Sequence, residues 1–188
     1  TYSFFALYAN IDGFTFSEDE VPVNERTELD RWILSELHTL IKLVDDAFGN
    51  FEPTKAGRAI QYFVTEHLSN WFVRLSRRRF WKGSYSKDKV EAYQTLYTVL
   101  ETISKLSSPI APFISDRIFM DLNKASGKDN AASVHLTDFP LADDSLIDKD
   151  LEERMELVTR KKADYAREEV LLPDEEKTNR LTELTRLE

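Results

Sequence analysis

The feature that most constrains this sequence is a hydrophobic pattern with three- and four-residue steps, which recurs in four consecutive segments. Apolar residues with this spacing line one face of an α-helix. The segments cover residues 27–49, 53–80, 86–107 and 113–126. Four amphipathic helices can bury their apolar faces only against one another, so the sequence predicts an all-α fold built as a helical bundle.

Cap and turn residues mark the ends of the first two helices. Thr27 is a typical N-cap, with Asp30 at the third helical position, and Gly49 follows the last apolar residue. Pro53 is tolerated in the first turn of the next helix. The connection between them is so short that we expect an antiparallel pair. The apolar stripe predicted for the second helix is Ile60, Phe63, Val64, Leu68, Trp71, Phe72 and Leu75.

Beyond the four helices, the sequence predicts little strand. A short extended segment is expected near 133–139, and a charged helical region from about residue 148 onward.

The chain contains no cysteine, which excludes a disulfide framework, a cysteine nucleophile and a thiolate metal site. No apolar run approaches the ~18 residues of a membrane span, and no signal peptide is recognised, so we expect a cytoplasmic protein.

Charge is distributed unevenly along the chain. The formal net charge is -9, which argues against indiscriminate binding to nucleic acid. Residues 74–89 depart from this balance, because seven basic residues oppose Asp88 alone and give a local net charge of +6. The seven are Arg74, Arg77, Arg78, Arg79, Lys82, Lys87 and Lys89. A basic island in an acidic chain indicates a targeted partner.

The sequence contains no recognisable catalytic or cofactor-binding motif. The three histidines, His38, His67 and His135, lie in separate segments without metal-ligand spacing. The five glycines are isolated, so no phosphate-binding loop is predicted. We therefore expect a non-catalytic segment that holds neither a metal nor a cofactor.

The second helix carries the most informative polar residues. At about 100° per residue, Asn70, Arg74, Arg77 and Trp81 fall on one stripe beside the buried face. A guanidinium group binds phosphate or a base edge, an amide pairs with a base edge, and an exposed indole stacks on an unpaired base. These residue types are suited to single-stranded RNA.

A purely structural alternative explains the same residues. The arginines could pair with acids of the first helix, such as Asp45 and Asp46, while Trp71 and Trp81 fill the bundle. A third interpretation is a helical protein-interaction module whose basic stripe meets an acidic partner. Spacing alone leaves these alternatives open.

Several motifs, in a fixed order, resemble the isoleucyl-tRNA synthetase family of class I aminoacyl-tRNA synthetases. They cover roughly residues 1 to 158 and are the segments 2–10 (YSFFALYAN), 29–35 (LDRWILS), 68–81 (LSNWFVRLSRRRFW), 108–114 (SPIAPFI) and 133–136 (SVHL). Some of these motifs are shared with the valine, leucine and methionine enzymes, and valine is the nearest alternative. In such enzymes this region is the helical anticodon-binding bundle that follows the catalytic domain.

The resemblance implies a piece of an isoleucine-tRNA ligase that binds isoleucine tRNA. It implies ATP and magnesium for the parent enzyme only, since the ATP-binding signatures are absent here. By analogy with methionine enzymes, Asn70 and Arg74 contact the anticodon, and we expect phosphate contacts from Arg77, Arg78, Arg79 and Lys82, with stacking by Trp81. The implied regions are 1–26, a connection from the catalytic domain; 27–126, the four-helix bundle; and 127–188, the extended segment and charged helical region.

Overall fold

The computed structural model describes residues 1–81 and 84–171 of the 188-residue chain, with side chains up to residue 161. The chain divides into two compact units, Thr1–Asp148 and Lys149–Glu188. The second unit contains the charged helix α7 (Lys149–Leu171). Residues 127–148 were predicted to form one region with that helix, but they are part of the first unit.

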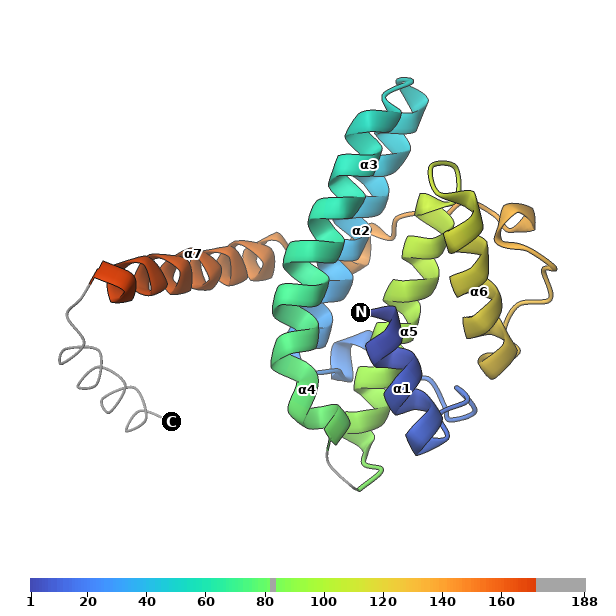
Figure 1. The fold of residues 1–188 in the computed structure, drawn as a ribbon, viewed down its shortest axis with the longest axis horizontal. Helices are drawn as coiled ribbons and strands as arrows, with labels where there is room; N and C mark the ends of the chain where they lie inside the picture. The colour runs from blue at the N-terminus through green and yellow to red at the C-terminus, as the bar shows by residue number, and fades with distance from the viewer. Residues whose placement is uncertain (82–83, 172–188) are drawn as a thin grey trace. The chain divides into compact units, whose positions relative to one another are not determined.

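The first unit contains the four predicted helices. They are α2 (Glu28–Gly49), a rod formed by α3 (Pro53–Tyr62), the π-helix η2 (Phe63–Val73) and α4 (Arg74–Trp81), then α5 (Lys87–Ser107) and α6 (Pro112–Ser126). In Figure 1, α2 lies beside the rod and α5 lies beside α6. The predicted all-α bundle is confirmed.

Local chemistry explains where these helices begin. The Thr27 hydroxyl accepts a hydrogen bond from the Asp30 backbone amide at 3.3 Å, as expected of the N-cap of α2. The Ser86 hydroxyl accepts the Lys89 amide at 3.4 Å at the start of α5. Pro53 lies in the first turn of α3, where the missing amide hydrogen costs nothing.

The N-terminal residues form a further helix, α1 (Tyr2–Asp12), which packs on α5. The rings of Phe5 and Tyr93 meet edge to face, with their centroids 6.1 Å apart. At the end of α1, Asp12 accepts a hydrogen bond from the Tyr93 hydroxyl at 2.5 Å and pairs with Lys89 at 2.5 Å. The segment predicted to be a connection is therefore an integral part of the bundle.

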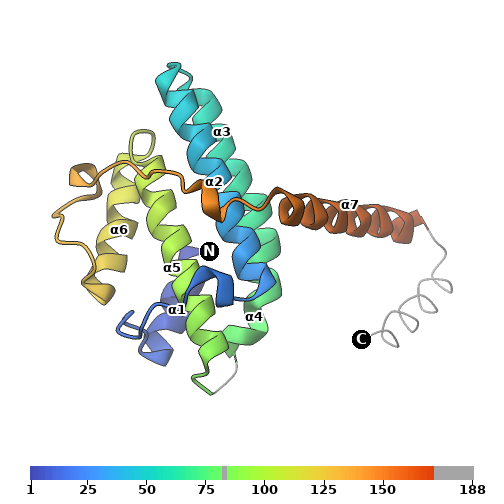
Figure 2. The same cartoon turned by 180° about the vertical axis from the view of Figure 1, so that it is seen from behind.

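After α6 the chain returns to α2 through two 3₁₀ turns, η3 (Val134–Leu136) and η4 (Asp144–Leu146), as Figure 2 shows. The backbone amide of Asp143 donates to Nδ1 of His38 at 3.0 Å, and that of Asp148 donates to the Ser35 hydroxyl at 2.8 Å. The extended segment expected near 133–139 is interrupted by η3, and no strand forms among the described residues.

The core lies between the two helical pairs. Its largest buried apolar side chains come from α2, η2, α4, α5 and α6 and include Ile33, Leu37, Leu68, Phe72, Phe80, Tyr93, Leu96, Leu106 and Phe119. None of the described helices is both long and apolar enough to cross a membrane.

Candidate nucleic-acid interface

The rod that carries the predicted site is not a uniform α-helix. Its middle section, η2, is a π-helix, in which hydrogen bonds close from residue i to i+5 and each turn is wider than in an α-helix. Its buried residues are Phe63, Leu68, Phe72 and Val73, and Phe63, Leu68 and Val73 lie five apart. The stripe predicted with an α-helical period is wrong at its end, because the wide turns change the register: Leu75 is 44% exposed, and Ser76 is buried instead.

The predicted site residues Asn70 and Arg74 belong to a longer series of residues along the rod. Tyr62, Glu66, Asn70 and Arg74 follow one another at four-residue steps. All but the partly buried Glu66 are exposed. Tyr62 was not among the residues predicted for the site, and its position two steps of four before Asn70 was the available signal in the sequence.

The predicted stripe faces solvent. Asn70, Arg74, Arg77 and Arg78 are exposed, and the Trp81 side chain is 57% exposed. The structural alternative suggested that Trp81 fills the bundle, and its exposure shows that it does not. An amide, guanidinium groups and an indole are all available to a partner along the outer side of η2 and α4.

Asn70 has one internal partner. Its Nδ2 donates to Oε2 of Glu66 at 3.2 Å, one step back along the rod. This bond lies at the exposed surface and orients the amide, while the amide oxygen stays available as an acceptor. The arrangement matches a group that pairs with a base edge.

The three outer arginines of α4, Arg74, Arg77 and Arg78, make no ion pair or hydrogen bond with the described part of the chain. We refer to them as the arginine patch. Uncompensated guanidinium groups at adjacent turns of one helix create a local positive potential. They retain their donors for phosphate oxygens or base edges.

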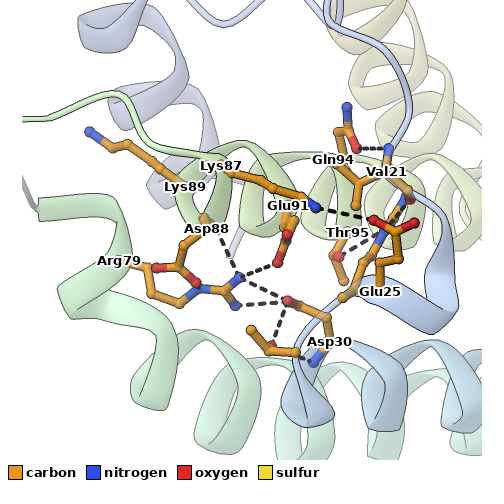
Figure 3. Close-up of polar contacts among 12 residues, drawn as sticks. Val21, Glu25, Asp30, Arg79, Lys87, Asp88, Lys89, Glu91, Gln94 and Thr95 are labelled. Atoms are coloured by element: carbon orange, nitrogen blue, oxygen red, sulfur yellow. Dashed lines mark hydrogen bonds and ion pairs between the residues drawn. The ribbon is translucent and has the colours of Figure 1, made fainter.

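Arg79 has a different role from the one predicted. Its guanidinium group forms two hydrogen bonds to Asp30, at 2.9 and 2.8 Å, and its Nε lies 2.8 Å from Oδ1 of Asp88 (Figure 3). The Arg79 side chain is 12% exposed and that of Asp30 is fully buried. Arg79 therefore joins α4 to α2 and α5, and its prediction as a phosphate contact is corrected.

The electrostatics of this cluster follow from burial and pairing. Burial opposes the charge of Arg79, but its bonds to Asp30 and Asp88 outweigh that cost and raise the pKa of the guanidinium group. Burial and the nearby Asp30 charge raise the pKa of Glu91, whose carboxylate lies 4.0 Å from Arg79. The structural alternative was right that an arginine pairs with α2, but the partner is Asp30 rather than Asp45 or Asp46.

The remaining basic residues of the island are divided between roles. Lys87 pairs with Glu25 at 3.1 Å, and Lys89 is buried against Asp12. Both lysines belong to α5 and hold neighbouring segments in place. Lys82, predicted to contact phosphate, lies outside the described residues. The local net charge counted from the sequence is thus an upper limit on the positive charge that is available to a binding partner.

No cluster of His, Asp or Glu suited to a metal ion is found in the described ranges. His38 accepts a backbone hydrogen bond, and His135 is exposed in η3. The His67 ring lies 5.3 Å from that of Tyr62, and its Nδ1 is 3.3 Å from Oε2 of Glu36. The three histidines therefore lie in three different environments and do not share a site.

Comparison with known sequences identifies a family that matches most of this chain. The sequence model of the family described as "Anticodon-binding domain of tRNA ligase" matches residues 30–181. That match covers α2, the rod, α5 and α6. The outward-facing polar residues of η2 and α4 thus lie inside the matched region.

The chain is similar to parts of proteins named isoleucine–tRNA ligase. It is 62% identical over 160 residues to the one from Cytophaga hutchinsonii, covering 85% of this chain and 14% of that protein. For Bacteroides thetaiotaomicron the identity is 59% over 157 residues, covering 84% and 14%. For Dehalococcoides mccartyi it is 52% over 159 residues, covering 85% and 16%. The chain therefore spans a small part of the length of these relatives.

Proposed function

This chain belongs to the family of anticodon-binding domains of tRNA ligases, and we propose that it binds the anticodon loop of isoleucine tRNA as part of a longer isoleucine–tRNA ligase. The observation that carries the proposal is the outer side of η2 and α4. There Asn70 and Arg74 lie exposed and four residues apart, beside the arginine patch. The names of the relatives support isoleucine as the amino acid.

The residues divide into three proposed roles. Asn70 and Arg74 read or position bases, because an amide and a guanidinium group can each form two hydrogen bonds to a base edge. Arg77 and Arg78 contact phosphates. Trp81 offers an exposed ring on which an unpaired base can stack. Arg79 is left out of this set because its donors are used within the bundle.

The chemical steps are assigned to other parts of the ligase. We propose that the parent enzyme uses ATP and magnesium in a catalytic domain of the same chain, and that it works in the cytoplasm. The described residues contribute binding: they hold the anticodon end of the tRNA while aminoacylation takes place elsewhere.

Direct binding tests the proposal. The 188-residue chain is titrated with labelled isoleucine tRNA, with the same tRNA carrying a mutated anticodon, and with valine tRNA. We expect the tightest binding to isoleucine tRNA. Equal affinity for the two isoleucine tRNAs contradicts base reading, and a preference for valine tRNA assigns the chain to a valine enzyme. Absence of binding to all three favours the protein-interaction alternative.

Matched variants connect the result to the site. Arg74→Ala removes a cation from the arginine patch, and Lys124→Ala removes an exposed cation from α6. Both change the net charge equally. We expect only Arg74→Ala to reduce the preference for the correct anticodon. Equal losses for the two variants indicate that the total charge, rather than this site, governs binding.

A further inference from the structure

Tyr62 is an exposed aromatic residue at the N-terminal end of the row formed by Tyr62, Glu66, Asn70 and Arg74. Its side chain is 60% exposed, although it lies next to residues of the core. A phenol ring this exposed gains little from burial, so packing alone does not explain it. Its hydroxyl group makes no hydrogen bond within the described part of the chain.

The Tyr62 ring is nevertheless held from behind. It meets His67 in an edge-to-face contact, with the ring centroids 5.3 Å apart. The His67 ring is itself held by Trp32 and Phe63, at centroid distances of 5.6 and 5.8 Å. An edge-to-face contact uses the face of only one ring, so His67 leaves at least one face of the Tyr62 ring uncovered.

A held aromatic ring suits stacking. Stacking on an unpaired base requires an exposed flat face, and a ring that is already ordered loses little conformational entropy on binding. Arg58 is exposed one turn before Tyr62 and makes no ion pair with the described residues, so a cation lies near the ring for an adjacent phosphate. Tyr62 is the last residue of α3, directly before η2, and lies eight residues before Asn70 on the same rod.

We propose that Tyr62 is a base-stacking residue of this surface, which extends the RNA contact along the rod to the N-terminal side of Asn70. The ligand is an unpaired RNA base of the loop whose neighbouring nucleotides contact Asn70 and Arg74. This inference rests on the proposed function. With Trp81 at the other end, it gives the row an aromatic ring on each side of its base-pairing groups.

The test replaces the ring in three ways and measures binding of isoleucine tRNA. Tyr62→Phe keeps the stacking face, Tyr62→Leu keeps apolar area without a ring, and Tyr62→Ala removes both. Phe113→Ala is the matched control, because Phe113 is 91% exposed but begins α6 outside the rod. We expect wild-type affinity for Tyr62→Phe and Phe113→Ala, and a loss of about tenfold for Tyr62→Leu and Tyr62→Ala.

Fluorescence identifies the stacked base directly. The fluorescent base 2-aminopurine is placed at each unpaired position of the anticodon loop in turn, and the wild-type chain is expected to quench it at the position stacked on Tyr62, separately from any position stacked on Trp81. That quenching should persist with Tyr62→Phe and disappear with Tyr62→Leu, while melting curves confirm that both variants are folded.

The outcomes separate the two proposals. If wild type discriminates between anticodons and Tyr62→Ala binds as wild type does, Tyr62 is not a stacking residue and the proposed function stands. If Tyr62→Leu binds with wild-type affinity, the contact is apolar rather than stacked, which overturns the inference. If wild type binds no tRNA, the proposed function fails and the role of Tyr62 fails with it.

Discussion

The inner and outer sides of α4 use the same amino acid in opposite ways. On the inner side, Arg79 is surrounded by the carboxylates of Asp30, Asp88 and Glu91 and is largely withdrawn from water. On the outer side, the arginine patch meets no carboxylate among the described residues. Arg78 and Arg79 are adjacent in the sequence, yet Arg78 belongs to the exposed surface and Arg79 to a largely buried ion-pair cluster.

This difference shows that a run of basic residues is not by itself a binding surface. A guanidinium group becomes structural where the fold brings carboxylates to it from other segments, here from α2 and α5. Its neighbour stays available where no such carboxylate arrives. The number of cations that a partner meets is therefore decided by tertiary structure.

The largest expected effect breaks the inner side. Arg79→Ala leaves the fully buried Asp30 without its ion pair, and we expect a loss of about 3–5 kcal/mol in the free energy of unfolding. Urea denaturation measures it. Arg78→Ala is the matched control on the outer side and should change stability by no more than about 0.5 kcal/mol. Similar values for the two variants would remove the distinction between the sides.

The second prediction tests the register set by η2. Val73 is 5% exposed and Leu75 is 44% exposed, the reverse of what an α-helical period gives. Val73→Ala should therefore cost about 2 kcal/mol of stability through lost burial and a residual cavity. Leu75→Ala should cost no more than about 1 kcal/mol, although it removes a larger group. A larger loss for Leu75→Ala in urea denaturation contradicts the π-helical register.

The third prediction sharpens the outer side. Arg77→Ala or Arg78→Ala should weaken binding to all tRNAs alike and reduce the slope of log affinity against log salt by about 1, because a phosphate contact is lost. Asn70→Ala should instead reduce discrimination between anticodons by about 1–3 kcal/mol, with little change in that slope. Titrations at several salt concentrations distinguish the two patterns. An unchanged slope in both arginine variants excludes the phosphate contact.

The smallest expected effect is a pH dependence at the segment that returns to α2. Burial lowers the pKa of His38 below its usual 6.5, against the opposing charge of Asp143. The folded state therefore binds fewer protons than the unfolded state at mildly acidic pH, and stability falls as the pH drops below about 6.5. Unfolding measured from pH 7.5 to 5 should show this fall, and His38→Gln should lack that component.

The bundle could be predicted because its information is local. Thr27, Gly49 and Pro53 mark helix ends through backbone chemistry that the sequence displays directly. The apolar steps between them locate the helices to within a few residues. The exposed positions of Asn70 and Arg74 also follow from their place beside the apolar stripe.

The remainder depended on contacts between distant segments. Arg79 meets Asp30 across 49 residues of sequence, and nothing in the basic run distinguishes it from Arg78. The π-helix was missed because a constant α-helical period was assumed, which misplaced Leu75. Phe63, Leu68 and Val73 lie five apart in the sequence, but Leu68 and the equally buried Phe72 lie four apart, which also fits an α-helix.

The number of residues in η2 decides which side chains of α4 face outward. Each residue of an α-helix turns the chain by about 100°, so deleting a single residue before α4 re-phases everything beyond it. Such a deletion would swing the partner of Asp30 toward solvent and bring a neighbouring arginine inward. Insertions and deletions between Phe63 and Val73 are therefore a route by which related chains could exchange one outward-facing set of side chains for another.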